Sequence, residues 1–145
     1  MLNQLKQLLS LDAQKDTTGP SKEMAMAALL AEVMLADGKA SQAEHARMAQ
    51  LLRRLTGQSE HVIQQLLNDT LAQQQDVVSL YEFTTELKNL PITEREQLLS
   101  SLWLLAFTDD YLDPEEEGVI RQVAELLYIP HSRFIWLKEQ ALQKS

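Results

Sequence analysis

The chain has 145 residues and no cysteine, which excludes disulfide frameworks, thiolate metal sites and cysteine nucleophiles. Hydrophobic residues make up 45% of it, enough for one globular domain with its own core. The formal net charge is −8, from 21 acidic and 13 basic residues, and this balance argues against binding of nucleic acid or anionic lipid through basic side chains.

The N-terminal segment is amphipathic, with one helical face formed by Leu2, Leu5, Leu8 and Leu9. It lacks the continuous apolar run of a secretory signal and the basic face of a membrane-surface helix. We therefore expect residues 1–20 to form a helical arm and linker that packs on its own domain, on a partner or on a second copy in a homodimer. Residues 21–145 would form the domain. No apolar stretch is long enough to span a bilayer, and a cytoplasmic protein is expected.

The rest of the chain has helical periodicity and no sustained alternation of the kind that marks strands. Glycine, proline and capping residues divide it into seven predicted helices, over residues 22–36, 42–56, 60–73, 77–89, 94–107, 114–129 and 131–144. The short connections between them predict an all-α fold, a compact helical bundle.

Several helix starts carry specific signals. Ser41 with Glu44 and Thr93 with Glu96 match the capping box, and Asp113 precedes a proline and three acids. Ser21 and Asp76 are the expected caps of two further helices. The helices over 24–36 and 98–107 are apolar nearly all round, which predicts that they are buried with the others around them. Trp103 and Trp136 are expected to pack in the core.

The two halves of the sequence resemble each other at an offset of 72 residues. A nearly all-apolar helix, a short acidic loop and an amphipathic helix follow one another in each half. The offset aligns three polar positions, Asp37 with Asp109, Ser41 with Asp113 and Glu44 with Glu116. Matching acids across a helix cap are a stronger signal of duplication than the apolar register, which two amphipathic helices can share by chance.

Carboxylates gather in both loops, and the second loop is the richer. Six of the acidic residues lie within 109–117, where there is no basic residue. Oxygen ligands of this kind suit Ca²⁺, Mg²⁺ or Mn²⁺ better than zinc. We therefore consider a divalent cation site, with candidate ligands Asp37, Glu44, Asp109, Asp110, Asp113 and Glu116. An EF-hand does not fit, since the twelfth loop position falls on Met48 or Ile120.

Structural roles explain the same residues without a metal. Glu44 and Glu116 suit capping-box partners of Ser41 and Asp113, and Asp113 itself suits an N-cap. Asp37 with Gly38 suits a C-terminal turn, and the remaining acids suit a solvated surface, namely Asp110, Glu115 and Glu117. His45 adjoins Glu44 and is expected on the surface of its helix, and Glu32 on a partly exposed edge. No arrangement typical of nucleophilic catalysis is present, and no general base completes a metal-dependent hydrolase. We expect no enzyme and no cofactor other than the cation.

These residues carry a resemblance to a known family. The segment 36–38 with Glu44, the helix running to Leu55 and the second acidic copy over 108–116 are similar to the TerB-like family, across roughly residues 24–141. That family is named for a tellurite-resistance protein and includes the N-terminal region of a membrane-anchored J-domain co-chaperone. The second loop departs from the family pattern, since Thr108 replaces Ala and Asp110 replaces Gly.

The resemblance implies a single all-helical domain of two packed repeats that binds divalent metal through Asp37, Glu44, Asp109 and Glu116. It also implies a role in stress-related protein complexes, with a peripheral link to membranes. A second hypothesis from the residues themselves is a metal-free interaction module, whose docking surface is the acidic loop or the leucine-rich arm. Either hypothesis predicts a protein partner and no nucleic acid.

Overall fold

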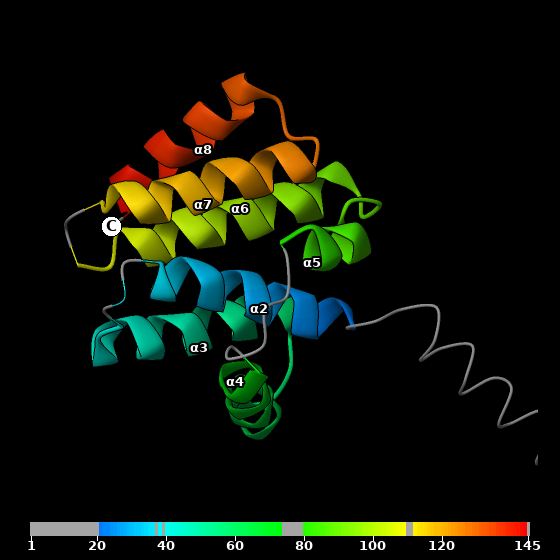
Figure 1. Cartoon of the computed structure of the whole chain (residues 1–145), viewed down its shortest axis with the longest axis vertical. Helices are drawn as coiled ribbons and strands as arrows, with labels where there is room; N and C mark the ends of the chain where they lie inside the picture. Colours follow the sequence, from blue (N-terminus) through cyan, green and yellow to red (C-terminus); the bar gives the residue numbers. More distant parts are fainter. Residues whose placement is uncertain (1–20, 37, 39, 74–79, 110–111, 145) are drawn as a thin grey trace, which may run out of the picture.

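The computed structural model describes residues 21–36, 38, 40–73, 80–109 and 112–144. Within these residues the chain is all-helical, with no strand (Figure 1). The helices are α2 (Lys22–Leu35), α3 (Gln42–Thr56), α4 (Glu60–Gln73), α5 (Leu80–Leu87), α6 (Ile92–Ala106), α7 (Pro114–Leu126) and α8 (His131–Lys144). The all-α fold expected from the periodicity is confirmed.

Helices α2 and α6 form the centre of the bundle. Their apolar residues surround the helix axis, so no single face of either helix can be left to solvent. Helix α2 contacts α3, α4, α5, α6 and α7, and α6 contacts α2, α3, α7 and α8. The prediction that these two helices are buried and wrapped by the others is therefore correct.

The contacts follow the sequence repeat. Helices α2, α3 and α4 correspond to α6, α7 and α8 at the offset of 72 residues. Each central helix packs on its own repeat and also on the second helix of the other repeat, as α2 does with α7 and α6 with α3. The two repeats therefore share one core and are not separate domains. Helix α5 precedes the second repeat and lies against α2 and α7.

Several helix ends have the caps that the sequence predicts. The Ser21 side chain accepts a hydrogen bond from the Met24 amide, and Ser41 and Glu44 form a complete capping box. The Asp113 carboxylate accepts from the Glu115 amide at 2.8 Å, with Pro114 in the first turn of α7. Gly57 ends α3 in the left-handed conformation, at φ 70°, where glycine has no steric penalty.

The predicted capping box at Thr93 is wrong. Helix α6 begins at Ile92, so Thr93 lies inside it, and Pro91 at the cap makes no side-chain hydrogen bond. The Glu96 carboxylate instead accepts two hydrogen bonds from the Arg133 guanidinium of α8, at 3.0 and 2.7 Å. This bidentate pair lowers the pKa of Glu96, mainly through the hydrogen bond to Arg133. Helix α5 ends at Leu87, two residues before the predicted end, and the predicted start at 77 and its expected cap, Asp76, lie outside the described residues.

The two tryptophans differ in environment. Trp103 is fully buried and packs on Phe107 and Phe134, as expected. Trp136 is 45% exposed and lies beneath the Arg133 guanidinium, 4.3 Å from its ring centroid, so its predicted core position is wrong. Among the described helices, α8 packs chiefly on α6 and α7.

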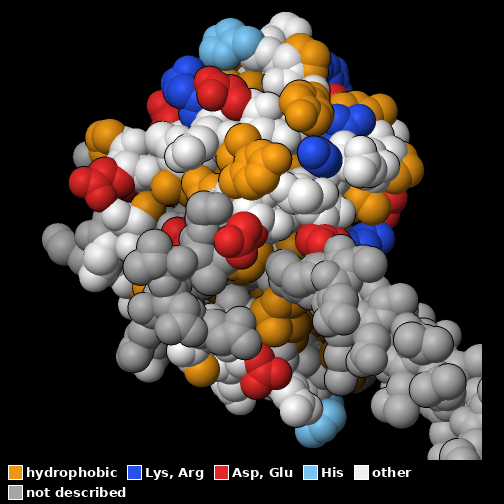
Figure 2. All heavy atoms as spheres, turned by 45° about the vertical axis from the view of Figure 1, so that its right-hand side comes forward, with side chains coloured by type: hydrophobic (Ala, Val, Ile, Leu, Met, Phe, Trp, Pro, Cys, Tyr) orange, Lys and Arg blue, Asp and Glu red, His pale blue; other side chains and the backbone are white. Residues whose placement is uncertain are grey.

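The face of the bundle that carries α5 is shown in Figure 2, where hydrophobic side chains lie in small groups between charged ones. None of the helices in the described ranges combines the length and apolar character needed to span a bilayer. The expected N-terminal arm falls within residues 1–20, outside the part of the chain that the structure describes.

Candidate functional site

The two acidic loops lie at one end of the bundle, opposite α5 (Figure 1). Helices α2 and α6 both run toward this end, and α3 and α7 both start there. One loop joins α2 to α3 and the other joins α6 to α7. The repeat therefore brings the two loops to the same end of the molecule, as the metal hypothesis requires.

Glu44 occupies the third position of α3, and only 3% of its surface is exposed. Its carboxylate accepts a hydrogen bond from the Ser41 amide at 3.1 Å, while the Ser41 hydroxyl accepts one from the Glu44 amide at 3.1 Å. The capping box holds the side chain back over the first turn. A carboxylate in this place is stabilised by the positive end of the helix dipole.

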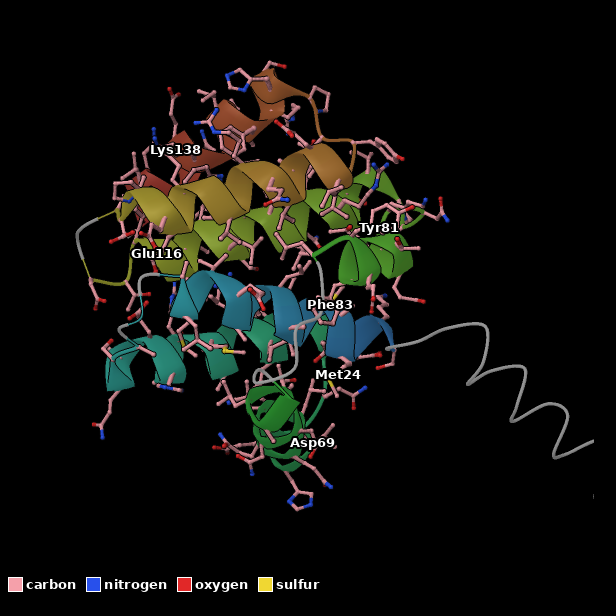
Figure 3. The ribbon with its side chains drawn as sticks, in the orientation of Figure 1. Met24, Asp69, Tyr81, Phe83, Glu116 and Lys138 are labelled. Atoms are coloured by element: carbon pink, nitrogen blue, oxygen red, sulfur yellow. The ribbon has the colours of Figure 1, made fainter. Side chains whose placement is uncertain are left out.

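Glu116 occupies the equivalent position of α7 and is buried to the same extent, with 3% exposed. It lies at the end of the bundle where α2 and α6 terminate (Figure 3). Acidic side chains are rarely buried to this degree unless they are paired or coordinate a metal. Two equivalent buried glutamates are the most distinctive feature of this end of the molecule.

The other predicted ligands are placed less uniformly. Asp109 is exposed and Asp113 is half-buried as the cap of α7. Asp37 and Asp110 lie outside the described residues. Of the six candidates, the structure therefore describes four, and two of these are buried in equivalent places.

Basic side chains reach the acidic end at Glu117, which was not among the predicted site residues. Its carboxylate lies 3.0 Å from the Lys138 Nζ and 3.7 Å from an Arg121 guanidinium nitrogen. The spacing of four residues between Glu117 and Arg121 is a sequence signal for this pair. These contacts give Glu117 a structural role and separate it from its neighbours Glu115, which is exposed, and Glu116.

The second loop also approaches the first repeat. Thr108 follows α6 and lines a groove of about 550 Å³ together with residues of α3 and α4, among them Ala43 and Arg47. The Thr108 hydroxyl donates to the Leu104 carbonyl, which fixes the start of the loop. The start of the second loop thus lies beside the first turns of α3, the helix that carries Glu44.

No three metal-ligating side chains come together within the described ranges. A complete set of ligands would therefore need Asp37 or Asp110 besides the described acids. The donors available are carboxylate oxygens, the ligands of hard cations. His45 is exposed on α3, as expected. Glu32 is half-buried on α2, one turn before this end, and burial raises its pKa.

Comparisons with known proteins agree with the resemblance. A search of curated proteins finds no match. Among solved structures, the chain is similar to a protein of unknown function from Porphyromonas gingivalis W83, with a TM-score of 0.59 and 16% sequence identity. The match covers 85% of this chain and 98% of that one, and at this identity it shows a shared fold only.

The family comparison covers most of the chain. The model of the tellurite resistance protein TerB matches residues 23–139, from the first turn of α2 to the last turns of α8. This range includes both repeats, both acidic loops and the two buried glutamates. The chain therefore belongs to the TerB family.

Proposed function

We propose that this chain is a non-enzymatic domain that binds a divalent cation, Ca²⁺, Mg²⁺ or Mn²⁺, through its two acidic loops. The ligands would come from Glu44 and Glu116 together with Asp37, Asp109 and Asp110. Asp113 serves as a cap and would assist through its remaining oxygen. The output would be a contact with a protein partner, in a complex that responds to stress.

The observation that carries this proposal is the pair of buried carboxylates at one end of the bundle. Glu44 and Glu116 occupy the same position in the two repeats, and each is 3% exposed. Duplicated helix starts need caps, but a cap works equally well at the surface. A cation shared by both loops would explain why the carboxylate is buried in both copies.

The chemistry of the donors restricts the cation. No cysteine is available, and the nearest histidine in sequence, His45, is exposed. A carboxylate-only set favours calcium, magnesium or manganese over zinc or copper. A bound dication would also offset the repulsion among the six acids between residues 109 and 117.

The proposal is tested by metal titration of the full chain. We expect Mn²⁺ binding in electron paramagnetic resonance to saturate, and thermal unfolding to shift upward by several degrees with the preferred cation. Glu116→Gln and the double variant Asp37→Asn/Asp109→Asn should bind at least tenfold more weakly. The titration is made at a temperature at which circular dichroism shows each variant to be folded, so that weaker binding does not result from unfolding.

Glu115→Gln is the matched control, because Glu115 lies in the same turn as Glu116 and is exposed. It should bind the cation as the wild type does. Equal weakening in Glu115→Gln and Glu116→Gln would mean a diffuse attraction of ions to the acidic surface and would contradict a defined site. Absence of saturable binding in the wild type would reject the proposal and favour a metal-free docking surface for a basic partner.

A further inference from the structure

An open groove lies between α3 and α6. It has a volume of about 250 Å³ and is lined by Leu51, Arg54 and Leu55 of α3, by Gln97, Ser100, Ser101 and Leu104 of α6, and by Lys144. Its floor is apolar, since Leu51 and Leu104 are buried there. The Ser101 hydroxyl donates to the Gln97 carbonyl within its own helix, so this serine does not need a polar partner from an occupant of the groove.

The other half of the molecule shows what fills the equivalent place. In the repeat, α3 corresponds to α7 and α6 corresponds to α2. The groove between α3 and α6 therefore corresponds to the place between α7 and α2, which are the helices that α5 packs against. Phe83 points from α5 toward α2 (Figure 3) and is buried together with Leu87. Helix α5 therefore covers the place between α2 and α7. The described part of the chain leaves the equivalent groove, between α6 and α3, open.

Burial of equivalent residues agrees with this comparison. Leu127, which follows α7 as its C-cap, and Ala28 of α2 are buried, whereas their counterparts Leu55 and Ser100 are only partly buried at the open groove. The first half thus has a prepared surface with no described helix on it. The missing element would precede α2, as α5 precedes α6.

The N-terminal arm shares part of the apolar pattern of α5. At the offset of 72 residues, α5 aligns with residues 8–15: Leu8 aligns with Leu80 and Leu11 with the buried Phe83, whereas two further buried positions of α5, Thr84 and Leu87, align with Asp12 and Lys15. The link to the next helix is also comparable, since Pro20 lies before α2 and Pro91 before α6.

We infer that the helical part of the N-terminal arm, which includes residues 8–15, docks in the groove between α3 and α6 of the same molecule. The arm is then the counterpart of α5, and each repeat consists of four helices. This inference does not depend on the cation site, which lies at the end of the bundle opposite α5.

The absence of cysteine allows a direct test on the full chain. A nitroxide spin label on Gln97→Cys, at an exposed position lining the groove, should broaden the amide resonances of residues 8–15. A label on Tyr81→Cys, exposed on α5, should broaden them much less. Equal broadening from both labels, or none from Gln97→Cys, would overturn the inference.

Two further samples distinguish the occupants. Leu8→Asp/Leu11→Asp should abolish the broadening, and Ser10→Asp should retain it, because Ser10 aligns with the exposed Glu82 of α5. A mixture of isotope-labelled cysteine-free protein with spin-labelled, isotope-free protein should show no broadening of the arm. Broadening in that mixture would place the arm on a second copy and contradict docking within one molecule.

Discussion

Glu32 is the charged side chain of α2 beyond its first turn, and its burial has a measurable consequence. Burial disfavours the ionised carboxylate and raises its pKa above the usual value of 4.5. The folded state therefore holds the proton more tightly than the unfolded state. Ionisation of Glu32 lowers the free energy of unfolding at neutral pH, and this penalty vanishes as the pH falls below about 4.5.

Glu32→Gln should accordingly raise the melting temperature at pH 7 and leave it nearly unchanged at pH 4. Thermal unfolding followed by circular dichroism across this range measures the difference. Glu125→Gln, at an exposed position of α7, is the control and should change little at either pH. A stabilisation by Glu32→Gln that persists unchanged at pH 4 would show that the carboxylate charge is not its cause.

The candidate site was predictable at the level of single residues only in part. Glu44 and Glu116 follow from the repeated spacing of acids, which is visible in the sequence. Their burial is not, because it depends on how the C-terminal ends of α2 and α6 meet the starts of α3 and α7. Asp109 and Glu117 illustrate the same limit: one is exposed and the other pairs with Lys138, a residue of a different helix.

At the scale of the helix, two glycines make a matched pair. Gly57 ends α3 at φ 70°, and Gly118 lies within α7; a Cβ added at either would meet no atom within 4 Å. Gly57→Ala should reduce the free energy of unfolding by about 1 kcal/mol, because alanine is strained in the left-handed conformation. Gly118→Ala should increase it by about 0.5–1 kcal/mol, because alanine loses less entropy in a helix.

Chemical denaturation of the two variants measures both changes. Neither position is sterically crowded. If the two substitutions change the free energy of unfolding in opposite directions, the backbone conformation of each glycine is therefore the cause. Equal destabilisation by the two substitutions would mean that contacts of the added methyl group, and not φ, determine the outcome.

Helix boundaries were predictable wherever the deciding interaction is local. Ser41 reaches a residue three positions away, and Gly57 needs only its own φ angle, so both ends of α3 were correct. The start of α6 was wrong because Glu96 binds Arg133, 37 residues away. Trp136 was misplaced for a related reason, since helical spacing does not indicate which side of α8 packs on α6 and α7.

At the scale of the whole molecule, the repeats are interlocked. Helix α2 packs on α7 of the second repeat, and α6 packs on α3 of the first. Neither repeat can therefore bury its central helix alone, and the two should unfold in one cooperative step. Leu30 and Leu102 are equivalent residues of these helices, and both have no exposed surface.

Leu30→Ala and Leu102→Ala should each reduce the free energy of unfolding by about 2–5 kcal/mol, because each leaves a cavity in the shared core. Circular dichroism reports on all helices, whereas tryptophan fluorescence reports only on the second repeat, which holds Trp103 and Trp136. Leu30→Ala, in the first repeat, should move the denaturation midpoints of both signals by the same amount. Leu142→Ala, at a position 49% exposed, should move them little. If Leu30→Ala shifted the circular dichroism midpoint and left the fluorescence midpoint in place, the repeats would be independent folding units, because destabilisation in the first would not reach the tryptophans of the second.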